Sequence, residues 1–149
     1  MPARAEARAS LVAPTKSTTP PSNASRYDAL ADPRRFLPLT PQVFHVLVAL
    51  SGEDRHGYGI IREVDAATDG DVRLRTGTLY TILKRLLDEQ LIVEAGERPA
   101  GSSLDERRRY YTITDLGRSV AKAEAQRLAR LVSLARSHRL LPRDGRAGR

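Results

Sequence analysis

The stretch of residues 76–92, which reads TGTLYTILKRLLDEQLI, constrains the fold more than any other part of the chain. Its apolar residues recur with the three- and four-residue spacing that places them along one side of a helix; they are Leu79, Ile82, Leu83 and Leu86. The opposite side and the flanks carry hydroxyl, aromatic and cationic side chains, which suit a nucleic-acid groove better than plain solvent. The pattern therefore predicts a helix over 76–90 with one buried face and one face that fits a polyanion.

Two further helices are predicted before this one. The pair Thr40-Pro41 is typical of a helix start, because threonine caps a helix and proline is favoured at the first helical position. A wide apolar face follows, and it ends at Ser51-Gly52, a helix-stopping pair. Residues 57–68 have a second, shorter helical periodicity. We expect residues 72–75 to add a brief extended segment before the helix at 76.

A β-hairpin is predicted after that helix. Residues 91–97 are rich in β-forming side chains, and residues 107–114, RRRYYTIT, alternate so that Tyr111 and Ile113 share one side. The segment 98–106 between them contains proline, glycine and two serines, which indicates a turn region. Three helices followed by a hairpin are the winged helix-turn-helix pattern. The predicted fold is therefore mainly α with a small β-hairpin.

A long helix is predicted at the C-terminal end. Thr114-Asp115 can start it, since threonine caps and aspartate offsets the positive end of the helix dipole, and Pro142 stops it near Leu141. Such a helix is about 40 Å long at 1.5 Å per residue and outreaches a three-helix core. Its broken apolar stripe needs a partner, and a second copy of the chain is the simplest one. We expect dimerisation through Val120, Leu128, Leu131 and Ala135.

These segments predict four parts of the chain. Residues 1–35, rich in proline, serine, threonine and alanine, are predicted to be a disordered basic tail. The winged helix-turn-helix domain is predicted at 36–114, the dimerisation helix at 115–141 and a short basic tail at 142–149. No apolar run approaches the roughly 20 residues that span a bilayer, and the start lacks the apolar core of a secretory signal. We therefore expect a cytoplasmic protein and no membrane contact.

The charge of the chain permits a polyanionic partner without proving one. The net charge is +7, and residues 107–149 hold 12 basic and 3 acidic residues. Residues 40–106, in contrast, hold 7 basic and 12 acidic residues. This acidic excess favours an alternative hypothesis, a winged-helix protein-interaction module without DNA binding.

Catalysis is not indicated by the residues present. The chain has no cysteine, which excludes disulfides, thiolate metal sites and cysteine nucleophiles. Its three histidines are too scattered for a histidine-rich metal site, and a Ser/His/Asp constellation, a phosphate loop and a convincing carboxylate pair are missing. We expect neither an enzyme nor a cofactor.

Three motifs resemble those of PadR-type transcriptional regulators. In chain order they are HGYG at 56–59, GTLY followed by LKRL at 77–86, and RYYTITDLG at 109–117. The resemblance covers roughly residues 39–141. The single predicted C-terminal helix resembles the subfamily of these regulators that has a short C-terminal region. One departure is Gln90, because the family usually has glycine between the recognition helix and the wing. A left-handed conformation there would cost a non-glycine residue about 1 kcal/mol.

The resemblance implies a dimer that places paired recognition helices in successive major grooves of a near-palindromic double-stranded DNA operator. It also implies a repressor that an effector releases, although the sequence identifies no effector. From a helix in the groove, hydroxyl and cationic side chains can reach base edges or phosphates; the predicted contacts are Thr76, Thr78, Tyr80, Thr81, Lys84 and Arg85. At the predicted wing tip, phosphate or minor-groove contacts are expected from Arg107, Arg108 and Arg109.

Overall fold

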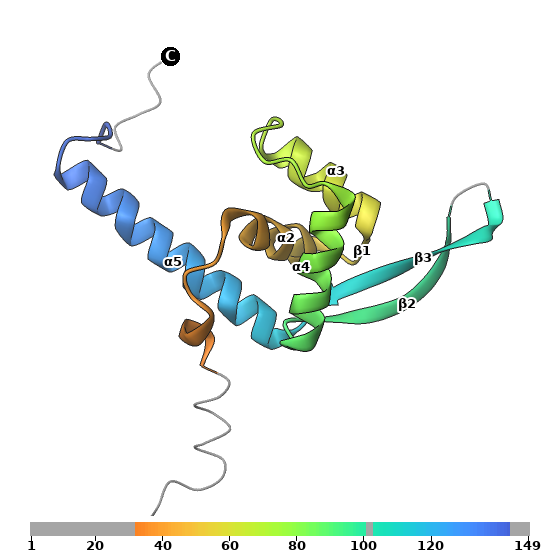
Figure 1. Ribbon diagram of the computed structural model, residues 1–149. Helices are drawn as coiled ribbons and strands as arrows, with labels where there is room; N and C mark the ends of the chain where they lie inside the picture. Colours follow the sequence, from red (N-terminus) through yellow and green to blue (C-terminus); the bar gives the residue numbers. More distant parts are fainter. Residues whose placement is uncertain (1–31, 101–102, 144–149) are drawn as a thin grey trace, which may run out of the picture. The chain divides into compact units, whose positions relative to one another are not determined.

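A computed structural model describes residues 32–100 and 103–143 of the chain, and for residues 98–100 and 103–107 it describes the backbone only. The fold is mainly helical with a small antiparallel sheet, which confirms the predicted fold class (Figure 1). In chain order the elements are η1 (Pro33–Phe36), α2 (Pro41–Gly52), β1 (Arg55–His56), α3 (Gly57–Ala67), α4 (Thr76–Asp88), β2 (Ile92–Ala100), β3 (Ser103–Ile113) and α5 (Asp115–Ser137).

The predicted helix starts are confirmed at two positions. The Thr40 hydroxyl accepts a hydrogen bond from the Val43 amide at 3.3 Å and caps α2. The Thr114 hydroxyl accepts one from the Gly117 amide at 3.0 Å and caps α5. Each bond satisfies an amide that has no partner within its own helix, so the sequence fixes where these two helices begin.

The core forms where α2, α3 and α4 pack against the base of the sheet and the start of α5. The apolar stripe of α4 is buried as predicted, and it faces buried side chains of the other elements. Those partners include Val46, Leu47, Leu50, Ile60, Val64, Ile113 and Val120. This packing holds α4 with its polar side turned away from the protein.

The sheet has a third strand that the sequence did not indicate. Its order is β1-β3-β2, and the two-residue strand β1 pairs antiparallel with β3, Arg55 opposite Tyr111 and His56 opposite Tyr110. The Arg55 side chain donates to the Ala49 carbonyl at 2.9 Å and contacts carboxylates of two acidic residues, which ties β1 to α2 and α3. The extended segment expected at 72–75 is not part of the sheet.

The hairpin is longer than predicted. Strand β2 continues to Ala100 and β3 begins at Ser103, although residues 98–106 were predicted to be a turn region. Pro99 lies opposite Arg107 on an outer strand, where a proline is tolerated. A bulge with Gly96 at φ +91° shifts the register between Glu94 and Glu97. The arginines at 107–109 therefore lie within β3 rather than at the tip, which is a correction.

Helix α4 ends at a left-handed residue, at the position where the family usually has glycine and this chain has glutamine. Gln90 has a φ of 58°, in the left-handed region. The Leu91 amide donates to the Leu86 carbonyl at 2.9 Å and the Gln90 amide to the Leu87 carbonyl at 3.0 Å. This is a Schellman arrangement, with buried Leu86 and Leu91 as its apolar pair. Glutamine at position 90 is therefore compatible with the turn between α4 and β2.

The helix α5 ends at Ser137, four residues before the predicted stop. Arg139 has a φ of 61°, and the Leu140 amide donates back to the Ala135 carbonyl at 2.9 Å. The same kind of left-handed cap thus ends the helix before Pro142 can. A second correction concerns Val120, which is fully buried in the core of the single chain. Its side chain has no surface to offer to a dimer.

The described part of the chain begins slightly before the predicted domain boundary at residue 36. Asp32 caps η1 by accepting from the Arg34 amide at 3.0 Å, and η1 lies against α5. Of the tails predicted at 1–35 and 142–149, residues 1–31 and 144–149 lie outside the described residues, whereas residues 33–35 belong to η1 and not to a disordered tail, which is a correction. Across the residues that are described, no helix is long and apolar enough to cross a bilayer.

Candidate nucleic-acid interface

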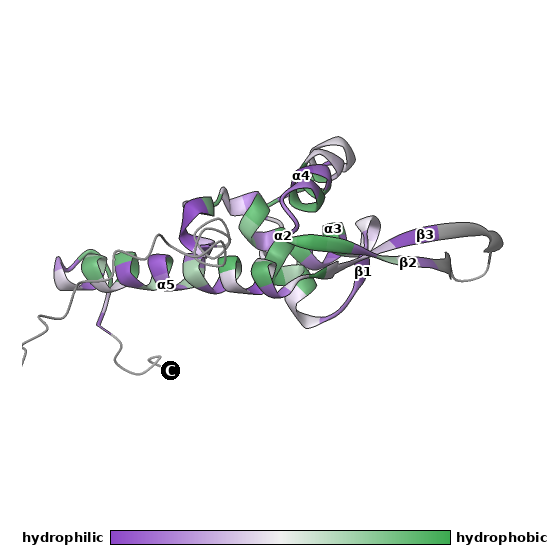
Figure 2. Cartoon of the chain, turned by 90° about the horizontal axis from the view of Figure 1, so that it is seen from below, coloured by the Kyte–Doolittle hydropathy of each residue, from purple (hydrophilic) through white to green (hydrophobic). Residues whose placement is uncertain are grey.

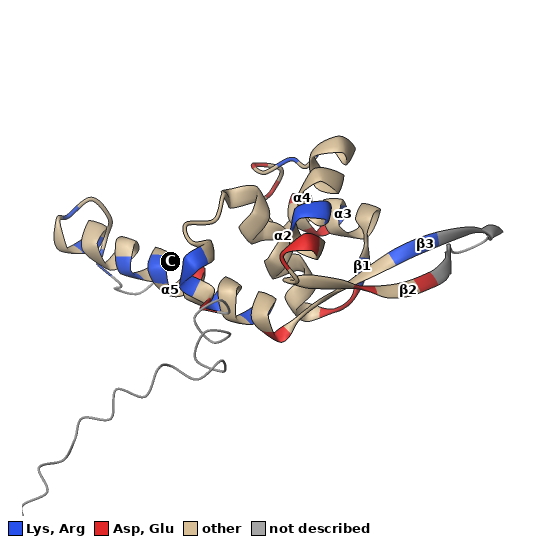
Figure 3. Ribbon diagram, turned by 60° about the horizontal axis from the view of Figure 1, so that its bottom comes forward, with Lys and Arg blue, Asp and Glu red and all other residues tan. Residues whose placement is uncertain are grey.

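The outward face of α4 carries the predicted contact residues. Thr78 is half-buried and the others are exposed, with 55% of Tyr80 accessible; the exposed set is Thr76, Tyr80, Thr81, Lys84 and Arg85. Figure 3 shows a cationic segment on this helix, followed by acidic residues near its C-terminal end. The periodicity that buries the leucines is therefore what brings these polar side chains together on the surface.

Some of these side chains already have partners within the helix. The Thr81 hydroxyl donates to the Gly77 carbonyl at 3.0 Å, and the Arg85 Nε lies 3.2 Å from a Glu89 carboxylate oxygen. Lys84 has no ion pair in the part of the chain that the structure describes. A polyanion would meet Lys84 directly, whereas Arg85 must exchange an exposed ion pair, which costs little.

The N-terminal end of α4 lacks a side-chain cap. Arg75 stands at the N-cap position and makes no capping hydrogen bond, although serine, threonine or aspartate is usual there. The first amides of α4 therefore keep their donors for solvent or for an anion, and the helix dipole favours an anion. This end of α4 also carries Thr76 and Thr78, two of the predicted contacts.

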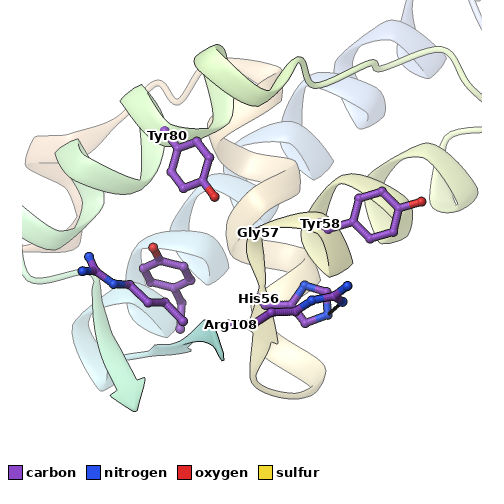
Figure 4. Close-up of a pocket in the computed structure, with 7 residues that line it drawn as sticks. His56, Gly57, Tyr58, Tyr80 and Arg108 are labelled. Carbon is purple, nitrogen blue, oxygen red and sulfur yellow. Dashed lines mark hydrogen bonds between the residues drawn. The ribbon is translucent and has the colours of Figure 1, made fainter. Parts of the chain in front are cut away.

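A hollow of about 480 Å³ joins α4 to α3 and β3 on this same surface. Its lining combines aromatic hydroxyls with cations (Figure 4), and its residues are His56, Gly57, Tyr58, Tyr80, Arg108, Arg109 and Tyr111. The Tyr80 hydroxyl lies 3.5 Å from where a Cβ of Gly57 would stand, so Tyr80 closes over the start of α3. Helix α4 and the hairpin thus contribute to one surface.

His56 is the residue of this hollow whose role the sequence did not reveal. Its Nδ1 accepts from the Gly59 amide at 3.0 Å and caps α3. Its Nε2 lies 3.0 Å from Arg108 Nη1, and the Tyr110 ring stands edge-on at 5.3 Å. Burial, and then the charge of Arg108, lower the pKa of His56 below its ordinary value. The position just before a helix start was the signal, but histidine is not a preferred cap.

Tyr111 forms the buried wall of the hollow. Its side chain is part of the core, while Tyr110 next to it points to the other side of β3, as the alternation predicted. Burial is the main cause that raises the pKa of Tyr111, and the nearby Glu94 carboxylate adds to it. Tyr111 therefore keeps its proton and can act as a hydrogen-bond donor.

The three wing arginines have different surroundings. Arg108 meets His56 at the hollow, whereas Arg109 Nη1 lies 3.6 Å from a Glu94 oxygen, with both side chains well exposed. The Arg107 side chain lies outside the described residues. Figure 3 shows cations along β3 next to acidic residues on β2. The cationic edge of the wing is therefore β3, on the side of the hairpin that reaches the hollow.

A second surface lies on the later half of α5. Leu131 is 49% exposed and Leu134 is 56% exposed, and Val132 is also exposed. Leu128 and Ala135 are half-buried. Figure 2 shows hydrophobic residues alternating with hydrophilic ones along this helix. An apolar hollow of about 350 Å³ adjoins it, lined by Leu39, Pro41, Phe44, His45, Glu124, Arg127 and Leu128.

One buried carboxylate near this surface was not predicted. Glu124 is almost completely buried, and both of its oxygens accept from Arg127, at 2.7 and 2.8 Å. These hydrogen bonds are the main cause that lowers the pKa of Glu124. Among the residues that the structure describes, no cluster of histidine, aspartate or glutamate could hold a metal ion.

Comparisons with known proteins agree with this arrangement. A crystal structure of a PadR family transcription regulator from Clostridium difficile has a TM-score of 0.56 at 22% identity, covering 66% of this chain and 98% of that one. A transcriptional regulator from Clostridium thermocellum has a TM-score of 0.52 at 23% identity, covering 64% of this chain and 87% of that one. At these identities the likeness shows a shared fold.

Sequence comparison gives the family itself. An uncharacterized protein X of Lysinibacillus sphaericus is 32% identical over 76 residues, which are 50% of this chain and 65% of that relative. The chain thus spans somewhat less than two thirds of the length of this relative. The model of the transcriptional regulator PadR-like family matches residues 46–123, just over half of the 149 residues. The chain belongs to the PadR-like family of transcriptional regulators.

Proposed function

We propose that the chain is a dimeric repressor that binds double-stranded DNA by placing α4 in the major groove. The observation that carries this proposal is the division of α4 into two faces. All four leucine and isoleucine residues of its stripe are buried, while Thr81, Lys84 and Arg85 are exposed on the other side. A helix held in this way can enter a groove without exposing its core.

The position of the wing supports the same orientation. Tyr80 from α4 and both Arg108 and Arg109 from β3 line one hollow, so the helix and the wing face the same side of the domain. When α4 lies in the groove, β3 lies over the adjoining sugar-phosphate backbone. Arginines there neutralise phosphates and release counterions, which strengthens binding at low salt.

A dimer follows from the apolar surface of α5. Exposed leucines on the later half of this helix are costly unless a second apolar surface covers them, and a two-fold copy offers the same surface in return. Two copies of α4 related in this way would read half-sites about one DNA turn apart. A dimer seated over a promoter would exclude polymerase, which is the basis of the proposed repression.

The effector that would release the protein is proposed to enter the apolar hollow between α2 and α5. That hollow adjoins the exposed stripe of α5 and contains the Glu124–Arg127 pair. A ligand there would shift α5 relative to α2, and the distance between the two copies of α4 would change with it. A shift in the spacing of the two recognition helices weakens binding to a fixed operator.

DNA binding can be tested with duplexes that the full chain selects from random sequence. Replacing Lys84 and Arg85 together with alanine should weaken binding by about 100-fold, since each contact is worth roughly 1–3 kcal/mol. The thermal midpoint should stay nearly unchanged because both side chains are exposed. Lys122→Ala removes an exposed cation of α5 and serves as the control.

The outcomes separate the competing functions. Selection of no duplex at low salt would overturn the DNA-binding proposal and leave the protein-interaction module, which the acidic excess in residues 40–106 favours. A large loss of stability in the double variant would mean that Lys84 and Arg85 are structural. For repression, transcription in vitro from a promoter that carries the selected site should fall when the protein is added; an increase would indicate an activator.

A further inference from the structure

Each ring nitrogen of His56 faces a hydrogen-bond donor, but the ring can accept a hydrogen bond on one nitrogen only. The Gly59 amide lies 3.0 Å from Nδ1 and the Arg108 guanidinium lies 3.0 Å from Nε2. Both neighbours are hydrogen-bond donors, and arginine cannot give up its protons. A neutral imidazole has a lone pair on one nitrogen only, and a protonated one has none. In the protein alone, therefore, one of the two contacts brings two donors face to face.

Nδ1 is the nitrogen that keeps its lone pair, and with it the hydrogen bond that caps α3. The Gly59 amide belongs to the first turn of α3 and has no partner in the helix, so losing the cap would leave it unsatisfied. Arg108 is exposed and can turn its charged head into solvent. Nδ1 is thus the acceptor, and Nε2 carries a hydrogen that points toward Arg108. Two N–H groups then converge on one point beside the hollow.

The charges around this point favour an anion. Among the residues whose side chains the structure describes, the lining of the hollow includes two arginines and three tyrosines and no carboxylate. Tyr58 stacks at 6.5 Å from His56 on one side, with the Arg62 guanidinium 5.8 Å from the Tyr58 ring, and Tyr110 stands edge-on at 5.3 Å on another. The Glu94 carboxylate lies at Arg109, not at Arg108. An anionic oxygen beside Nε2 would accept from both His56 and Arg108.

We infer that this point is a binding site for one backbone phosphate of the DNA, held jointly by His56 Nε2–H and the Arg108 guanidinium. The inference rests on the proposed DNA-binding function and specifies a contact that the motifs did not indicate. The phosphate oxygen turns a donor–donor conflict into two charge-assisted hydrogen bonds. It also couples the start of α3 to the wing, because the two ligands belong to β1 and β3.

A chemical scan of the duplex tests the site. Single phosphates of the selected duplex are replaced one at a time by neutral methylphosphonates, and affinity is measured for the full chain. In the wild type, one position in each half-site should lose about fivefold in affinity, beyond the loss at its neighbours. In Arg108→Ala and in His56→Asn the same replacement should cost clearly less than in the wild type, about twofold, because one of the two donors that hold that phosphate is already gone.

The variants are chosen so that folding does not decide the result. Asparagine is a good N-cap and retains the bond to the Gly59 amide, so His56→Asn should keep the thermal midpoint of the wild type. Lys122→Ala removes one cation on α5 and should show the full wild-type penalty at the same phosphate. If the penalty persists unchanged in both His56→Asn and Arg108→Ala, the phosphate site is wrong although DNA binding stands. If the wild type selects no duplex, the proposed function and this site fail together.

Nitrogen chemical shifts of the histidine ring give an independent readout. In the free protein Nδ1 should show the shift of a lone-pair nitrogen and Nε2 that of a protonated one. Addition of the selected duplex should move the Nε2–H signal, and the methylphosphonate duplex should not. Inorganic phosphate forms a separate arm: a shift at millimolar concentration without one from DNA would assign the site to a free anion and overturn the DNA contact. A lone pair on Nε2 in the free protein would overturn the donor arrangement itself.

Discussion

Helices α4 and α5 are both amphipathic, but only the apolar face of α4 is covered along its whole length by the described part of the chain. In α4 every residue of the apolar stripe is buried within the chain, and the remaining face is polar and cationic. In α5 the buried residues end at Glu124, and the later turns expose Leu131 and Leu134. The exposed face of α4 therefore suits a polyanion, whereas that of α5 suits another apolar protein surface.

The largest expected effect concerns that exposed face of α5. Replacing both Leu131 and Leu134 with glutamate should convert a dimer to monomers, because four leucines would be lost from a two-fold interface at about 1.5–3 kcal/mol each. Light scattering at micromolar concentration measures the change. Ser133→Glu adds one carboxylate at an exposed position on another side of the helix and should leave the mass unchanged. An unchanged mass in the leucine variant would show that this half of α5 is not the interface.

Substitutions in the earlier half of α5 should change the stability of the folded domain and not its oligomeric state. A Cβ at Gly117 would collide with the Leu91 carbonyl and stand 2.8 Å from Ile113 Cγ1. Gly117→Ala should therefore destabilise the domain by about 3 kcal/mol, since backbone rather than a flexible side chain is in the way. Denaturant unfolding measures this loss.

The same substitution in α4 provides the control for Gly117. A Cβ at Gly77 would meet nothing within 4 Å, so Gly77→Ala should stabilise the helix by up to about 1 kcal/mol. Opposite signs at two helical glycines would confirm that close packing, not helix propensity, requires Gly117. Equal stabilisation at both positions would mean that α5 is not anchored on the Leu91 carbonyl.

The buried carboxylate of α5 should make stability depend on pH. Hydrogen bonds from Arg127 lower the pKa of Glu124 in the folded chain, so its contribution to stability is present above the ordinary carboxylate range and is lost as pH falls through it toward the folded pKa. Glu124→Gln should lower the thermal midpoint by several degrees at pH 7. The difference from the wild type should shrink at pH 3. A constant difference across this range would show that packing, not charge, is the cause.

The sequence predicted those features that depend on local patterns. The stripe through Leu79 and Leu86 placed α4 and its polar face, and Thr40 and Thr114 placed the starts of α2 and α5. Such signals are readable because helix periodicity and capping involve residues that are close in the chain. The left-handed conformation of Gln90 was suggested only by the resemblance, because the family usually has glycine at this position.

The features that the sequence missed depend on distant partners. Strand β1 has only two residues and exists because Arg55 and His56 meet β3. The length of the hairpin, which moves Arg108 from the tip to the hollow, is set by pairing along β2. Glu124 has a local partner, since Arg127 three residues later satisfies both oxygens, but its burial depends on residues of α2 and of the segment before it, which line the same hollow. None of these features can be predicted from the helical or strand periodicity of the local sequence.

The smallest expected effect concerns the way in which the two helices end. Gln90 and Arg139 both adopt a left-handed conformation that costs a non-glycine residue roughly 1 kcal/mol. Gln90→Gly should relieve this cost in the folded chain but add freedom to the unfolded one, for a net gain of about 0.5 kcal/mol. Arg139→Gly should change the unfolding midpoint less, because Leu140 after it is 78% exposed, whereas Leu91 after Gln90 is buried in the core. Denaturant curves in the Leu131→Glu, Leu134→Glu background separate this gain from dimerisation. A loss of stability in Gln90→Gly would show that the glutamine side chain itself supports the turn between α4 and the wing.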